Sequence, residues 1–125
     1  MRTCLYVVVL CSMALSAVAG ELVTVESKDK TSQSIPLKFV VEKTKMSGEY
    51  FEVWGTVRNT SQSTYFYVFV TITLRRNGEF IGRAELNAQP QKIGPGQVAH
   101  LTQELIACED RRPDTLEFMV SAELE

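Results

Sequence analysis

Long hydrophobic runs and charge of one sign are both missing from this chain of 125 residues. No apolar stretch approaches the roughly 20 residues that a membrane-spanning helix requires. The net charge is only −2, and basic and acidic residues are interleaved without a block of either sign. A nucleic-acid surface needs a basic stripe, and anionic lipid recognition needs a polybasic cluster. The sequence therefore predicts neither kind of partner, and it has no glycine-rich phosphate loop.

The first nineteen residues have the composition of a cleavable leader. Arg2 precedes an apolar segment from Leu5 to Leu15, and the small residues Ala17-Val18-Ala19 follow. A positive start, a short apolar centre and a small-residue exit are the three parts of a secretory signal. We expect residues 1–19 to be removed after Ala19, and the protein to be periplasmic or secreted with no transmembrane segment left.

Cleavage would leave very few metal-binding or catalytic side chains. Cys4 and Cys11 would be lost, so that Cys108 remains as the only cysteine beside one histidine, His100. Zinc and blue-copper sites need more ligands than these, and no nucleophile stands at a recognisable spacing from His100. The sequence predicts no enzyme, no cofactor and no metal centre. Lipid anchoring at Cys11 is an alternative, although Leu10 precedes it where a small residue is usual.

A lone cysteine in an exported protein is either a buried thiol or the site of a bridge between chains. Because a free cysteine usually behaves as a small hydrophobe, we expect Cys108 to be buried. Without an internal disulfide, the mature chain must be stable through its hydrophobic core alone.

Short alternating segments separated by turn residues predict an all-β fold. Residues 20–34 are expected to form one short strand and a polar linker, and residues 35–125 a single domain. About seven strands at intervals of about ten residues, with no helix, are typical of an immunoglobulin-like antiparallel β-sandwich. The expected strands are 22–25, 37–41, 50–58, 64–74, one after Asn77-Gly78, 97–106 and 115–124.

Two hairpins are predicted from strand parity. Residues 50–58 and 64–74 alternate with period two and are joined by a short loop. Their pairing would place Trp54 opposite Phe69, Thr56 opposite Tyr67 and Arg58 opposite Tyr65, all on a face away from the core. The alternate positions would face the core, and these are Phe51, Val53, Gly55, Val57, Phe66, Val68, Val70, Ile72 and Leu74.

The second hairpin turns at Asn77-Gly78. A two-residue turn would bring Arg83 and Glu85 to the buried face, so we expect a three-residue loop from Arg76 to Gly78, with Gly78 left-handed. This loop would place Leu74 opposite Phe80 and Ile72 opposite Gly82.

The sequence resembles the FxLYD-type extracellular domains. The resemblance lies in Gly55-Thr56-Val57-Arg58-Asn59-Thr60-Ser61, the long strand after it, Asn77-Gly78-Glu79-Phe80-Ile81-Gly82 and Gly94-Pro95-Gly96. It covers residues 53–105, and the motif that names the family is missing at residues 71–76. The resemblance implies an immunoglobulin-like fold and brings no catalytic residues.

An aromatic sheet face is the most informative feature of the sequence. Trp54, Tyr65, Tyr67 and Phe69 would share the outer side of the first hairpin, and contiguous exposed aromatic residues often mark partner-binding surfaces. We therefore predict a non-enzymatic binding domain that contacts a protein, a glycan or another copy of itself. The other reading is aromatic pairing that only stabilises the sheet.

Two other functions remain open. A periplasmic copper carrier would use His100, Cys108 and Met119, and a structural subunit of an envelope assembly would be joined through Cys108. The sequon Asn59-Thr60-Ser61 is interpreted as a turn asparagine that hydrogen-bonds its own backbone rather than as a glycosylation site.

Overall fold

The computed structural model describes residues 22–27 and 35–125, apart from the side chains of residues 102 and 103. The predicted leader with Cys4 and Cys11, and most of the polar linker, lie outside the described residues. Within these ranges, no helix combines the length and the apolar character needed to cross a membrane.

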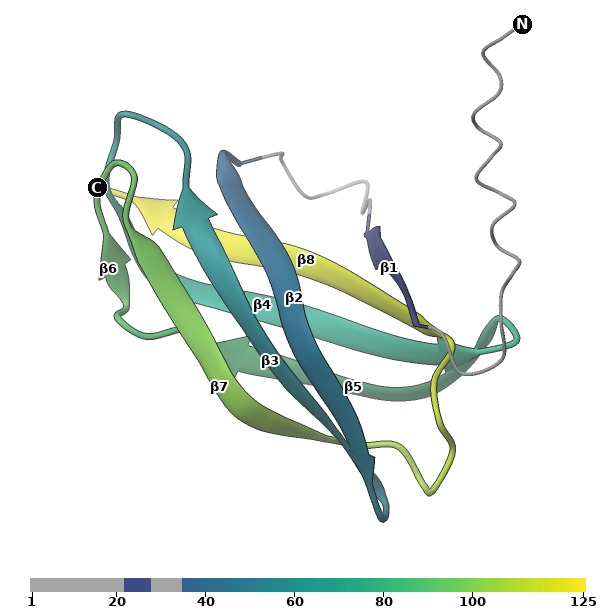
Figure 1. Ribbon diagram of the computed structural model, residues 1–125. Helices are drawn as coiled ribbons and strands as arrows, with labels where there is room; N and C mark the ends of the chain where they lie inside the picture. Colours follow the sequence, from purple (N-terminus) through teal and green to yellow (C-terminus); the bar gives the residue numbers. More distant parts are fainter. Residues whose placement is uncertain (1–21, 28–34) are drawn as a thin grey trace, which may run out of the picture.

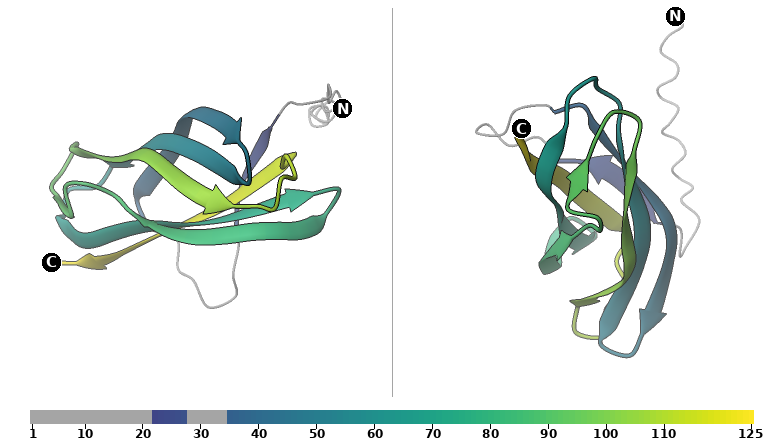
Figure 2. Two further views of the ribbon diagram at one scale, coloured as in Figure 1. Left: turned by 90° about the horizontal axis from the view of Figure 1, so that it is seen from below. Right: turned by 90° about the vertical axis from the view of Figure 1, so that its left-hand side faces the viewer.

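Two β-sheets pack face to face across the hydrophobic core (Figure 1). The left view of Figure 2 shows the two layers from the side, with β2, β3 and β7 in one and β4, β5 and β8 in the other. The strands are β1 (Val23–Glu26), β2 (Leu37–Ser47), β3 (Tyr50–Asn59), β4 (Tyr65–Arg76), β5 (Glu79–Asn87), β6 (Lys92–Ile93), β7 (Val98–Ala107) and β8 (Thr115–Leu124). The prediction of an all-β sandwich is confirmed.

The smaller sheet has the order β2-β3-β7, and the larger has the order β1-β8-β4-β5 with β6 beside the start of β4. All pairs are antiparallel except β1 with β8. Apolar side chains at alternate positions of the central strands fill the space between the sheets. On β3 and β4 these are Phe51, Val53, Val57, Val68, Val70, Ile72 and Leu74, each at most 1% exposed, as their alternation predicted.

The predicted hairpin of residues 50–58 with 64–74 is wrong. β3 pairs with β2 and β7, whereas β4 pairs with β8, β5 and β6, so residues 60–64 carry the chain from one sheet to the other. Two strands that each have one apolar face can bury it as neighbours in one sheet or as members of two sheets that pack against each other. The alternation of residues along each strand is the same in both arrangements and does not distinguish them. The pairs of Trp54 with Phe69, Thr56 with Tyr67 and Arg58 with Tyr65 therefore do not form.

The β4–β5 hairpin keeps Arg83 and Glu85 out of the core, but the extra residue that achieves this lies in β5 and not in the turn as predicted. Asn77 and Gly78 have φ of 52° and 80°, and Arg76 pairs directly with Glu79, which defines a two-residue turn rather than a three-residue loop. An extra residue, Ile81, then enters β5 as a bulge between the pairs Arg75–Phe80 and Leu74–Gly82. The bulge turns Arg83 and Glu85 to solvent, as expected, but the partners are shifted by two residues. The two residues beside the turn have the opposite faces to those predicted, since Phe80 is 54% exposed and Ile81 is buried in the core.

A second bulge, in β4, reverses the orientation of the strand's first residues. Tyr67 has φ of 55° within the strand, and the β4–β8 register shifts between Phe66 and Phe69. Tyr65 therefore points inward and is only 8% exposed, while Phe66, which the alternation placed in the core, is half-buried and lies beside the exposed Tyr67. The prediction that Tyr65 lies on an outer face is wrong because parity changes at this bulge.

Buried Asn59 fixes the crossing between the sheets. Its amide nitrogen donates to the backbone oxygens of Ser63, at 2.7 Å, and of Ile93, at 3.0 Å. Its side-chain oxygen accepts hydrogen bonds from the backbone N–H of Ser61, at 2.9 Å, and from the Ser61 hydroxyl, at 2.7 Å. The bond to the Ser61 N–H is the turn interaction that the sequence predicted for the sequon asparagine.

Candidate functional site

The structure separates the four aromatic residues of the predicted binding face. Trp54 lies half-buried on the outer side of the smaller sheet, and Phe69 lies half-buried on the outer side of the larger sheet. Tyr67 is 61% exposed at the β4 bulge, and Tyr65 belongs to the core. No single surface contains all four, so each outer face has to be considered separately.

The outer face of the smaller sheet combines cationic and apolar side chains. Four lysine or arginine residues and three exposed apolar residues surround Trp54, and we call this surface the basic–aromatic face. Its members are Lys38, Val40, Lys43, Lys45, Tyr50, Trp54, Arg58 and Leu105. Val40 and Tyr50 are each 46% exposed and Leu105 is 52% exposed, which is more apolar surface than a solvated sheet face requires.

A bulge in β2 aligns the cations of this face. Val41 pairs with Gly55 and Lys43 pairs with Trp54, so Glu42 is the extra residue. Without it, Lys43 and Lys45 would point toward the other sheet. With it, both lysines join Lys38 on the outer side, because a one-residue shift exchanges the two faces of a strand.

At one end of this face, two like charges stand directly opposite each other. Lys38 of β2 pairs with Arg58 of β3, and both are exposed. The Arg58 guanidinium donates to the Gly96 backbone oxygen at 3.2 Å. Among the described residues neither cation has an ion pair with a carboxylate, whereas Arg75–Glu117 and Arg111–Glu79 pair elsewhere. Like charges opposite each other destabilise a sheet, and such local conflicts are expected at functional sites.

Trp54 lies at the centre of the face, and a lysine contacts its ring. The Nζ atom of Lys43 lies 4.6 Å from the ring centroid, in a cation–π contact. Glu52, the acidic residue at the outer position between Lys45 and Leu105, is 7% exposed. The half-exposed Trp54 ring is therefore in contact with one cation and lies beside the other lysines of β2.

A smaller aromatic cluster marks the outer face of the larger sheet. The Phe66 and Tyr67 rings lie 6.1 Å apart, and Lys92 Nζ is 5.3 Å from the Phe66 centroid. Glu123 stands directly opposite Phe66 on β8. This face lacks the aligned cations of the basic–aromatic face.

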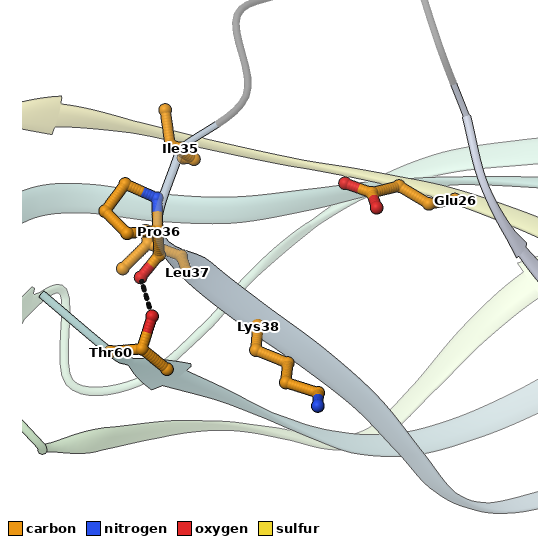
Figure 3. Close-up of a pocket in the computed structure, with 6 residues that line it drawn as sticks. All are labelled: Glu26, Ile35, Pro36, Leu37, Lys38 and Thr60. Atoms are coloured by element: carbon orange, nitrogen blue, oxygen red, sulfur yellow. Dashed lines mark hydrogen bonds between the residues drawn. The ribbon is translucent and has the colours of Figure 1, made fainter.

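A pocket of about 300 Å³ lies where β2 begins and β3 ends, and Figure 3 shows the residues that line it. Ile35, Pro36 and Leu37 line it, together with Lys38, Glu26 and Thr60. The Thr60 hydroxyl donates to the Pro36 oxygen at 3.0 Å, so it is already engaged. The lining includes no cysteine or histidine and offers no recognisable nucleophile and base.

The structure does not bring together the residues of the copper hypothesis. His100 is exposed on the outer side of the smaller sheet, opposite Thr56. Met119 lies on β8 at an outward position of the larger sheet, and Cys108 is buried. Two of the three ligands thus lie on opposite outer faces. Among the described residues, no group of three or more histidine, cysteine, aspartate or glutamate side chains could hold a metal ion.

Cys108 is a buried free thiol, as expected, and its Sγ lies 3.8 Å from the Met46 Sδ. Burial raises the pKa of this thiol, the charges of Asp110 and Glu109 raise it further, and a backbone hydrogen bond from Arg111 acts in the opposite direction. A raised pKa in the folded state means that folding favours the protonated thiol over the thiolate. The stability that the protonated Cys108 thiol contributes is therefore fully present below the pKa of a free cysteine. It is lost as the pH rises through the folded-state value.

The Cys108 peptide should react with a thiol-alkylating reagent at least about a thousandfold more slowly in native protein than in denaturant at pH 8, because reaction requires opening of the core. Isotope-coded alkylation followed by mass spectrometry measures this ratio. A native rate near the denatured rate, or a Cys108-linked dimer on a non-reducing gel, would contradict the burial of the thiol.

Comparison with known proteins finds no matching family model, no similar curated protein and no similar solved structure. The resemblance to FxLYD-type domains, and an immunoglobulin-like relationship, stay predictions. Sequence reasoning identified Trp54 but missed the aligned lysines. Their residue types are visible in the sequence, but the bulge at Glu42 that aligns them is not.

Proposed function

We propose that this protein is a non-enzymatic binding domain, exported to the periplasm or beyond the cell, which contacts a negatively charged partner through its basic–aromatic face. The observation that carries the proposal is the clustering of Lys38, Lys43, Lys45 and Arg58 around Trp54, on a chain whose net charge is −2. Positive charge on one face of an otherwise acidic protein steers association with a partner of opposite charge.

The composition of the face supports the same conclusion. Tryptophan, tyrosine and arginine dominate the binding energy of interfaces, and all three are present here. The catalytic alternatives have no corresponding support in the described residues, where His100 is solvent-exposed and Cys108 is buried beside Met46.

Trp54→Ala should reduce recovery of the partner at least about tenfold, because truncation of a central tryptophan is among the most damaging changes to an interface. For the measurement, cells express the full chain with a tag, and the tagged protein is crosslinked to its partner in the cell envelope. The amount of partner recovered with the tagged protein is then quantified. Tyr67→Ala is the matched control, since it removes an exposed aromatic ring from the other sheet.

Melting temperatures show whether either variant loses stability. If Trp54→Ala unfolds, Lys43→Glu replaces it, because Lys43 is exposed. Equal losses with Tyr67→Ala, or full recovery with both Trp54→Ala and Lys43→Glu, would contradict the assignment of the face.

A further inference from the structure

We infer that the partner of the basic–aromatic face is an acidic polysaccharide that lies along β2. The inference rests on the proposed function and adds the chemical class of the partner. Lys38, Lys43 and Lys45 follow one line, because outward positions of a strand are collinear. At about 3.3 Å per residue the line is about 20 Å long. A linear polymer with repeated negative charges matches such a line, whereas a compact anion would use one end of it.

The aromatic surface beside this line favours sugars among linear polyanions. Trp54 is directly opposite Lys43, and Tyr50 continues the outer face toward the other end of β3. The C–H faces of a pyranose ring are apolar and stack on aromatic rings, while carboxylate or sulfate groups project from its rim. An acidic sugar unit therefore needs an aromatic ring and a cation within reach of each other. The Nζ atom of Lys43 lies over the Trp54 ring, 4.6 Å from its centroid, so this residue pair provides both.

The Lys38–Arg58 pair supports an anionic group at a defined place. These two cations are direct cross-strand neighbours and have no carboxylate partner among the described residues. A carboxylate or sulfate bound between them would relieve their repulsion. This position lies at one end of the line, and Trp54 lies near its middle.

Other large partners fit the face less well. Lysine is depleted in the cores of protein–protein interfaces, yet Lys43 lies next to the central Trp54. Insertion into a bilayer needs a continuous apolar face that reaches about 5–10 Å into the headgroup region. Here the apolar surface is interrupted, because Val40 lies between Lys38 and Lys43 on the outer side of β2, and Leu105 is opposite Glu52. A nucleic acid would require a larger excess of basic charge than a chain of net charge −2 provides.

The test measures binding of polygalacturonate and of heparin, as a carboxylated and a sulfated probe, with neutral dextran as the uncharged probe. The protein is purified after export from cells that express the full chain. Lys43→Glu/Lys45→Glu should weaken binding of the acidic polymers at least about tenfold, because it reverses two contacting charges. The matched control Arg83→Glu/Lys92→Glu changes net charge equally at exposed positions of the larger sheet and should bind like the unchanged protein.

Circular dichroism establishes that all variants are folded. Stronger binding to phosphatidylglycerol vesicles than to the acidic polysaccharides would overturn the inference in favour of a membrane. If a single-stranded DNA oligonucleotide displaces the bound acidic polysaccharide as effectively as the free polysaccharide does, the inference is overturned in favour of a general polyanion site. If no acidic polysaccharide binds but Trp54-dependent crosslinking persists, the polysaccharide is wrong and the binding face stands. If no acidic polysaccharide binds and crosslinking does not depend on Trp54, both the polysaccharide inference and the proposed binding face are overturned.

Discussion

Replacing Asn59 by alanine should lower the free energy of unfolding by about 3 kcal/mol, because a fully buried side chain loses four hydrogen bonds, one of them in the interior and three at partly buried positions. The groups left behind include the Ile93 carbonyl and the backbone N–H of Ser61. Asn59→Asp should be at least as damaging, since it keeps the shape but turns two donated bonds into contacts between oxygen atoms. Urea unfolding followed by fluorescence measures both changes.

Asn87→Ala is the matched control, because Asn87 is an exposed asparagine on β5. Its effect should stay within about 0.5 kcal/mol, as for ordinary surface positions. A change of less than 1 kcal/mol for Asn59→Ala would contradict the role assigned to Asn59, which is to hold the passage from β3 to β4 against β6.

Gly82→Ala should destabilise the protein by about 3 kcal/mol, at the upper end of the usual cost of overpacking. A β-carbon at Gly82 would collide with the backbone oxygen of Ala107, and it would lie 3.6 Å from the Cα of Cys108. The obstacle is backbone rather than a flexible side chain, so β5 and β7 would have to separate where the two sheets meet. Thermal and urea unfolding measure the loss.

Gly94→Ala provides the comparison for this variant. The nearest atom to its added β-carbon is the Gln97 side-chain oxygen, at 3.3 Å, and a side chain can move away. We expect it to cost less than about 1 kcal/mol. Equal stability of Gly82→Ala and the unchanged protein would show that the edges of β5 and β7 are not in close contact.

Strand positions and inner faces were predictable because alternation is a local property. The run from Thr115 to Leu124 was expected as a strand and is β8, and the apolar positions of β3 and most of those of β4 form the core. The partner of each strand is a long-range property. Parity allowed β3 and β4 to pair as a hairpin, but their apolar faces meet across the sandwich instead.

The candidate site depended on the features that alternation cannot show. Bulges at Glu42, Tyr67 and Ile81 each reverse a strand's faces, and none has a glycine or proline at the extra residue to announce it. The bulge at Tyr67 took Tyr65 out of the predicted binding surface. The bulge at Glu42 placed two lysines beside Trp54. Of the four aromatic residues of the predicted binding face, Trp54 is the one that belongs to the proposed basic–aromatic face.

The parallel pairing of β1 with β8 has a mechanical consequence. Residues 23–26 run beside residues 115–118 in the same direction, and hydrogen bonds at both ends join Val23 to Asp114 and Ser27 to Phe118. A pull between residue 22 and residue 125 would act along both strands in opposite senses. The bonds of this ladder would then be loaded together in shear rather than opened one after another, so tension along the chain meets its resistance at this short edge of the sandwich.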